Sequence, residues 1–243
     1  MGRRVSIEDA LGKVEKLYKL TESKLVENDN RWIAFNELSR KIRASLNALH
    51  YIPYEEYEVL CAPTNLLYRS IITDLMTLLL ISQVNDEQLQ DVIDIFDYDF
   101  AKSLNYSLKV NIEIRKATYP HDADAFEEQR REYQDQLYDD LKDLLSSEKG
   151  EEWILKPKKK VSIKGYDFNG NVSQMYDILK SYDDVSGFAY LYQYYRLLSQ
   201  SEHFSIKGRT FNYKQSFHEE YYNKVRGFLY LGADYLITKY SKS

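Results

Sequence analysis

The 243-residue sequence lacks the residues on which several classes of protein depend. A single cysteine, Cys61, excludes an internal disulfide framework and a cysteine-based zinc site. We expect this thiol to be a small buried hydrophobe. Only 4 prolines and 9 glycines argue against a loop-rich β architecture.

Long apolar runs and a strong excess of one charge are also missing. The longest largely apolar run, Leu75–Ile81, is too short to cross a bilayer, and no signal peptide is recognisable. We therefore expect a cytoplasmic protein with no membrane partner. The net charge of -5 carries no general signature of nucleic-acid binding, so any contact with phosphate needs a local basic patch.

Sequence motifs for the common catalytic chemistries are absent. No glycine-rich loop follows a strand, and no nucleophile elbow is present. The four histidines, His50, His121, His203 and His218, show no paired spacing of the kind that metal sites use. The sequence predicts neither a metal nor a cofactor.

Helical periodicity is the feature that the chain does have. Apolar residues recur at intervals of three and four in eight segments, which predicts an all-α, single-domain bundle of roughly eight helices over residues 1–243. An irregular lysine-rich loop at about 150–171 interrupts the pattern. The expected helices cover approximately 6–27, 32–49, 63–80, 86–116, 126–144, 173–179, 187–205 and 217–236.

Helix-start signals sharpen some of these boundaries. Ser6 to Asp9 reads as a capping box, Pro63 is expected to open the third helix, and Ser173 is expected to cap the sixth. The stretch 51–62 is then a connector with an extended piece at 57–60. Gly227 and Gly232 in the last helix indicate close packing against a neighbour.

The third predicted helix is apolar on every side, which is typical of a central helix. Arg69 and Asp74 lie inside this run. A buried charge is costly unless it is paired. Because the two residues are five positions apart and point in different directions, we expect their partners on other helices.

The seventh predicted helix, Gly187–Ser205, is aromatic for four turns and then becomes polar. At helical spacing Arg196, Ser199 and His203 share one face, with Tyr195 at its edge. We expect a polar cluster between the third and seventh helices, either as a binding site or as a structural network that fixes helix register. Its expected members are Arg69, Asp74, Tyr195, Ser199, Glu202 and His203.

Two charged segments offer further contacts. The basic loop carries Lys158, Lys159 and Lys160, which are candidate phosphate contacts if they are not simply a solvated surface. The fifth predicted helix has a heavily acidic outer face. That face is either solvated or an interaction surface for a basic partner.

An arginine followed by four to six residues and a histidine recurs in the sequence, as Arg196 to His203, Arg43 to His50 and Arg115 to His121. This pattern resembles the signature of the HEPN (higher eukaryotes and prokaryotes nucleotide-binding) ribonucleases, which are helical bundles. The resemblance implies metal-independent RNA cleavage across a homodimer interface, with Arg196 holding phosphate and His203 assisting catalysis. Family members usually carry a polar residue after the arginine, whereas Leu197 and Ala44 stand there in this chain.

A second resemblance covers roughly Pro63 to Ser205. The run from Leu67 to Asp74 and the later Tyr195, Ser199 and His203 are similar to a bacterial helical domain-of-unknown-function family. Its members carry an arginine, an acidic residue one or two turns later, and a Tyr…Ser…His segment. The resemblance implies an all-α fold and a bacterial source, and it brings no established activity.

Three readings of function follow from these observations. The first is a bacterial helical protein that acts by binding a protein or ligand, in a stress or defence system. The second is a metal-independent ribonuclease that uses Arg196 and His203. The third is a binder of a small molecule or nucleotide in a bundle pocket beside Arg69.

Overall fold

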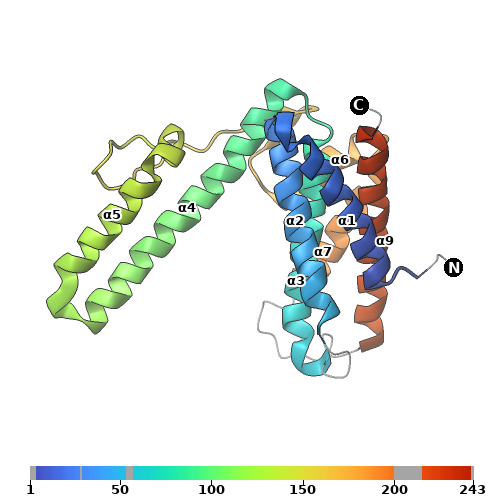
Figure 1. The fold of residues 1–243 in the computed structure, drawn as a ribbon, viewed down its shortest axis with the longest axis horizontal. Coiled ribbons are helices and arrows are strands. Elements are labelled where there is room, and N and C mark those ends of the chain that lie inside the picture. The colour runs from blue at the N-terminus through green and yellow to red at the C-terminus, as the bar shows by residue number, and fades with distance from the viewer. Residues whose placement is uncertain (1–3, 28, 53–56, 200–214, 242–243) are drawn as a thin grey trace. The chain divides into compact units, whose positions relative to one another are not determined.

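The computed structural model describes residues 4–27, 29–52, 57–199 and 215–241, with the backbone alone at Glu27, 57–62 and 215–218. These residues form eight α-helices and one two-stranded sheet, which confirms the predicted all-α bundle (Figure 1). The chain divides into two compact units, which are described separately below. That the two units belong to one domain, as the sequence predicts, stays a prediction.

Unit 1 comprises residues 1–89, 163–166 and 171–243. Its central helix is α3, which packs against α2, α6, α7 and α9, while α1 packs against α2 and α9 (Figure 1). The side chains from Leu78 to Leu80 are fully buried, as expected of a helix that is apolar all round. The helices are α1 (Ile7–Lys24), α2 (Asn30–His50), α3 (Tyr57–Ile81), α6 (Val172–Lys180), α7 (Leu191–Ser199) and α9 (Gln215–Tyr240).

Three of the expected helix starts in unit 1 are wrong. The seventh helix is expected to begin at Gly187, but Ser186–Tyr190 forms a 3₁₀ turn and α7 begins at Leu191. Helix α3 begins at Tyr57 and contains Pro63, so most of the expected connector is helical. Proline lacks the amide donor of one helical hydrogen bond, and α3 nevertheless continues on both sides of Pro63. The cap of α6 is Asn171, whose side chain accepts a hydrogen bond from the Ser173 amide. Sequence alone does not decide between Asn171 and Ser173 as the cap, because Asn and Ser are equally good cap residues.

Other local predictions for unit 1 can be compared directly. Ser6 and Asp9 form the expected capping box. A Cβ atom on Gly232 would lie 2.9 Å from Leu75 Cδ1, so this glycine does allow close packing of α9 on α3. A Cβ atom on Gly227 would meet no neighbouring atom of the described residues within 4 Å, so the expected close packing is wrong there.

Unit 2 comprises Gln90–Ser162 and Asp167–Gly170. It contains most of α4 (Asp86–Thr118) and all of α5 (Ala123–Leu141), which run side by side as a helical hairpin (Figure 1). A small core holds one end of this hairpin together. It consists of Ala101, Leu141, Leu145 and Trp153, with partly buried neighbours such as Leu104 and Leu137.

The basic segment after α5 is irregular, as predicted, apart from a small β-hairpin. Strands β1 (Val161–Ile163) and β2 (Tyr166–Phe168) are joined by Lys164 and Gly165. Both turn residues have positive φ, at 52° and 82°. Such a pair is typical of a tight hairpin turn, and glycine at the second position makes it inexpensive.

One described helix segment is long and apolar enough to cross a membrane. It is Pro63–Ile81, which has a mean hydropathy of 1.2, and 72% of it is buried inside the fold. The core helix of a globular protein has the same properties, so this segment is weak evidence for a membrane span.

Candidate functional site

The structure brings two of the predicted site residues together between α3 and α7. Arg69 Nη2 donates a hydrogen bond of 2.9 Å to the hydroxyl of Tyr195. The guanidinium also lies over the Tyr195 ring, 4.9 Å from its centroid. Arg69 is therefore stabilised by a phenol on another helix, as a half-buried arginine requires.

Asp74 lies on another side of α3 and faces α2 instead. Lys41 Nζ lies 2.8 Å from Asp74 Oδ1, and the Ser70 hydroxyl lies 3.4 Å from Oδ2. Burial raises the pKa of this carboxyl, and the hydrogen bond from Lys41 opposes the increase. The expected cluster is therefore divided, and Asp74 belongs to an ion pair in the bundle.

The remaining members of the predicted cluster are only partly described. The Ser199 hydroxyl donates a hydrogen bond of 2.9 Å to the Arg196 carbonyl, within the last turn of α7. The side chain of Arg196 is exposed. Glu202 and His203 lie outside the described residues, as do the side chains of Cys61 and His218.

Tyrosines extend the Arg69 contact along the surface of α6 and α7. The ring of Tyr195 is stacked on that of Tyr192, with centroids 6.1 Å apart. Tyr192 in turn lies 5.3 Å from Tyr176, and Lys180 lies over the Tyr176 ring. Because these ring faces are covered by one another, this row is best explained as packing between the helices.

The other arginine and histidine matches have local partners. Arg43 Nε lies 2.8 Å from a Glu15 carboxylate oxygen, and His50 Nδ1 lies 3.2 Å from Glu8. Arg115 Nη1 donates to Gln129 at 3.1 Å. None of these pairs brings its arginine and histidine together by a described contact.

Two of the three candidate phosphate-binding lysines are engaged inside unit 2. Lys158 Nζ lies 2.5 and 2.6 Å from the two carboxylate oxygens of Asp99. Lys159 Nζ lies 2.7 Å from Asp94, while Lys160 is exposed. A phosphate at Lys158 or Lys159 would have to compete with these carboxylates, which weakens that use of the loop.

A pocket of about 350 Å³ in unit 1 has a more specific chemistry. It lies among α1, α2, α3 and α9. Part of its wall is apolar and consists of Ile7, Leu49 and Ile52. The lining also contains Arg226, Tyr68, Tyr222 and Thr64. Pockets of this size and mixture are common for small ligands.

Arg226 is the unusual residue of this pocket. It is only 8% exposed. Its Nε donates to the Val5 carbonyl at 2.8 Å, and Nη1 donates to the Tyr68 hydroxyl at 2.7 Å. Both acceptors are neutral, and no carboxylate of the described residues lies within ion-pair distance of the guanidinium. Three of its five N–H donors have no acceptor among those residues.

The aromatic residues beside Arg226 are held in a fixed arrangement. The rings of Tyr68 and Tyr222 are stacked, with centroids 4.2 Å apart and planes inclined by 7°. Tyr222 donates a hydrogen bond of 2.5 Å to Asn65 Oδ1. Burial raises the pKa of Tyr68, so its hydroxyl keeps its proton at neutral pH. Since that oxygen already accepts from Arg226, its proton is available for an acceptor in the pocket.

Thr64 adds a second polar group without a described partner. This residue is 5% exposed and belongs to the pocket lining, and its hydroxyl has no hydrogen-bond partner among the described residues. A buried hydroxyl of this kind usually bonds to protein or to water. Thr64 therefore lines the same pocket as the buried guanidinium of Arg226.

Two carboxylates also line the pocket, and each has a described partner. Glu219 forms an ion pair with Arg4. Glu8 lies 3.2 Å from His50, and hydrogen bonds from its own backbone amide and from Ser6 lower the pKa of its carboxyl. Arg226 is therefore the lining charge that has no charged partner among the described residues.

The sequence pattern did not single out Arg226, although a signal for it exists. The residue stands among Val225, Phe228 and Leu229 in a predicted helix. A charge inside an apolar helical run was the reason for selecting Arg69, and the same reasoning applies to Arg226. Its burial depended on which face of α9 meets α1 and α3, which periodicity alone leaves open.

Among the described residues no three His, Cys, Asp or Glu side chains gather as metal ligands do. No family model, curated protein or solved structure matches the chain. The two family resemblances therefore stay predictions.

Proposed function

We propose that this protein is a binding protein whose unit 1 holds a small organic anion against Arg226. The observation that carries the proposal is the buried guanidinium, whose only described acceptors are the Val5 carbonyl and the Tyr68 hydroxyl. This is the third reading given by the sequence, with Arg226 in place of Arg69.

The energetic reason is the cost of burying an uncompensated charge. Removing an ion from water costs several kcal/mol unless a counter-charge and hydrogen bonds replace the solvent. Two neutral acceptors replace only part of that hydration. A carboxylate or phosphate would supply both the counter-charge and a bidentate acceptor for two of the three remaining N–H groups of Arg226.

The surrounding residues narrow the class of ligand. Thr64 and Tyr68 can each donate a hydroxyl proton to the same anion, while Leu49 and Ile52 favour an apolar body. Glu219 and Glu8 already have partners in Arg4 and His50, so Arg226 is the charged lining group that is left for an anion. A singly charged anion with an apolar group, such as an aryl or alkyl carboxylate, fits this arrangement best.

Thermal unfolding across a panel of anions tests the proposal. We expect 10 mM benzoate or hexanoate to raise the melting temperature at constant ionic strength, while chloride and acetate have little effect. For a dissociation constant of about 1 mM the gain is roughly 1.4 kcal/mol, or about 3–6 °C for a chain of this size. Phosphate and phenyl phosphate are included in the panel to distinguish a preference for phosphate from a preference for carboxylate.

Matched variants locate the effect. Arg226→Gln should remove the anion-dependent increase, and Thr64→Val should reduce it. Lys224→Met, which removes an exposed charge from the same helix, should leave it unchanged. If no anion of the panel stabilises the wild-type protein, or if Arg226→Gln responds as wild type does, the proposal is wrong.

The other readings of function remain predictions. The ribonuclease reading is supported by the exposure of Arg196, and it requires His203, which lies outside the described residues. A bacterial cytoplasmic setting, a role in stress or defence and a homodimer are expectations from the resemblances alone.

A further inference from the structure

Part of the Arg226 pocket is lined by a segment that precedes the first helix. Arg4 and Ser6 belong to the pocket lining, and α1 begins at Ile7. Ser6 is the N-cap of α1, so this end of the segment is fixed to the helix. Arg4 and Val5 lie outside the helix and depend on other contacts for their position.

The backbone of Val5 supplies two of these contacts, both to side chains of α9. The Val5 amide donates a hydrogen bond of 3.0 Å to Asn223 Oδ1, and the Val5 carbonyl accepts one of 2.8 Å from Arg226 Nε. Asn223 and Arg226 are three residues apart, so they share one side of α9. The segment is therefore attached to α9 at two points about one helical turn apart.

Little apolar contact adds to this attachment. Arg4 forms an ion pair with Glu219, but the Arg4 side chain is 70% exposed, so solvent weakens the pair. Ser6 is also exposed, and Val5 is only half-buried. A segment that a few hydrogen bonds hold in place opens more easily than a packed helix does.

Arg226 connects this segment to the anion proposed for the pocket. The Val5 carbonyl occupies the Nε donor, and the Tyr68 hydroxyl occupies one donor of Nη1. The remaining donors are therefore on Nη1 and Nη2, where a carboxylate can bind both nitrogens side by side. Val5 thus holds the guanidinium on its Nε side and leaves the Nη side to the ligand.

A second hollow, of about 260 Å³, lies next to the same segment. It is lined by Arg4, Glu219, Glu220 and Asn223, so it shares Arg4 and Glu219 with the Arg226 pocket. If residues 4 and 5 moved away from α9, the wall formed by Arg4 would be removed from both hollows. The Arg226 pocket would then be more open to solvent.

We propose that residues 4–6 act as a lid that closes over the bound anion, and that Asn223 is the positioning residue that holds this lid closed. The proposal rests on the anion site proposed for Arg226. A ligand that contacts Arg4 and Ser6 only in the closed state stabilises that state, and closure raises the affinity for the ligand by the same factor. Asn223 lies outside the lining of the Arg226 pocket, so it acts on the ligand through Val5.

Hydrogen exchange of the Val5 amide, followed by NMR, measures opening of the lid. Asn223 is the acceptor that the described residues give this amide. With 10 mM benzoate and a dissociation constant of about 1 mM, exchange should become roughly tenfold slower. A ligand that binds only the closed lid lowers the open population by that factor.

Variants of Asn223 test the attachment without a ligand. Asn223→Ala removes the acceptor, so exchange of the Val5 amide should become at least about threefold faster, the effect of losing one hydrogen bond. Asn223→Asp keeps an acceptor oxygen and should stay within about twofold of the wild-type rate.

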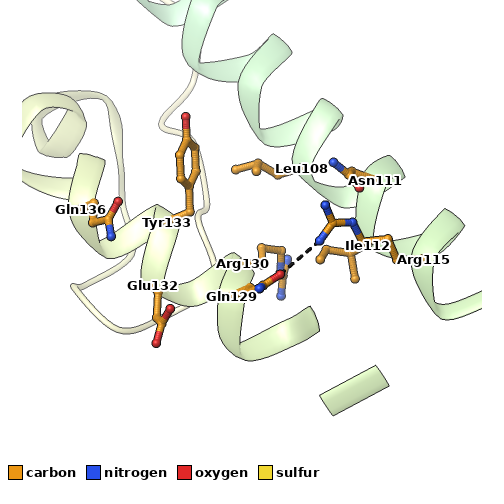
Figure 2. Close-up of a pocket in the computed structure, with 9 residues that line it drawn as sticks. All are labelled: Leu108, Asn111, Ile112, Arg115, Gln129, Arg130, Glu132, Tyr133 and Gln136. Atoms are coloured by element: carbon orange, nitrogen blue, oxygen red, sulfur yellow. Dashed lines mark hydrogen bonds between the residues drawn. The ribbon is translucent and has the colours of Figure 1, made fainter. Parts of the chain in front are cut away.

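A matched control removes the same side chain in unit 2. Asn111 is exposed and lines the groove between α4 and α5 (Figure 2). Asn111→Ala should therefore leave exchange of the Val5 amide unchanged. The buried Leu79 reports global opening, and exchange of its amide should be the same in wild type and Asn223→Ala.

The outcomes distinguish the lid from the function on which it rests. If benzoate does not raise the melting temperature of the wild-type protein, the anion site and the lid are both wrong. If benzoate raises the melting temperature and leaves exchange of the Val5 amide unchanged, the anion site stands and the lid is wrong. The lid is also wrong if Asn223→Ala exchanges at the wild-type rate, or if the Leu79 amide or Asn111→Ala shows an equal acceleration.

Discussion

Replacing Lys41, the partner of Asp74, should lower the free energy of unfolding by the cost of burying the Asp74 carboxylate without that partner. Asp74 is 4% exposed, and Lys41 lies 2.8 Å from it. In Lys41→Met the Ser70 hydroxyl, at 3.4 Å, is the one partner that the described residues still give this carboxylate. Because the Lys41 side chain is 55% exposed, solvent already screens the pair. We therefore expect a loss of about 1–3 kcal/mol at pH 7, the range for leaving a buried acceptor without its partner.

The loss should depend on pH in a defined direction. The pKa of Asp74 is raised in the folded protein, so the native state binds its proton more tightly than the unfolded chain does. This contribution to stability is fully present below the ordinary aspartate pKa and is lost as pH rises through the raised pKa. Lys41→Met raises that pKa further, so the variant should approach wild-type stability as the pH falls from 7 toward 4.

Urea unfolding can measure this in unit 1 alone. Trp32 is buried in unit 1 and Trp153 in unit 2, so Trp153→Phe leaves one fluorescent reporter in the unit that contains Asp74. Adding Asp74→Asn to Lys41→Met should recover most of the lost stability at pH 7. A loss that is the same at pH 7 and pH 4, or that Asp74→Asn does not reduce, would refute the assignment of an ionised, partner-dependent Asp74.

Two further outcomes follow from the described geometry. Gly232→Ala should destabilise the protein by about 1–3 kcal/mol, because its Cβ would meet Leu75. Gly227→Ala should stabilise it by about 0.4–1 kcal/mol, because the added methyl group has room and alanine favours the helix. Urea unfolding of the two variants separates the effect of packing from that of helix propensity. If the ribonuclease reading is correct, Arg196→Ala should abolish RNA cleavage assayed with a chelator present while the melting temperature stays within about 1 °C of wild type, since the side chain is exposed. Wild-type protein without cleavage activity would end that reading.

Much of the fold could be predicted from the sequence because apolar periodicity reports burial directly. The fourth helix begins at Asp86 as expected, and the lysine-rich segment does interrupt the helices. The start of α3 could not be predicted in the same way. A proline reads as a helix start by local preference, whereas α3 continues on the N-terminal side of Pro63 as far as Tyr57.

The candidate site was predictable only in part, for a related reason. Periodicity identifies a charge in an apolar helix, as it did for Arg69 and Asp74, but it gives no information on which neighbouring helix each charge meets. The bundle places Asp74 against Lys41 and buries Arg226 beside Tyr68. Both contacts join segments far apart in the chain, so their pairing depends on the tertiary arrangement of the helices.

Isothermal titration of benzoate into the wild-type protein and Arg226→Gln tests the central claim most directly. The account predicts one binding site with a dissociation constant of about 1 mM or tighter, as expected for a ligand of this size with one strong polar contact. The affinity should fall at least about tenfold in Arg226→Gln and stay unchanged in Lys224→Met. Equal binding by all three proteins, or no binding by the wild type to benzoate, hexanoate and phenyl phosphate, would contradict the claim that Arg226 awaits an anionic ligand.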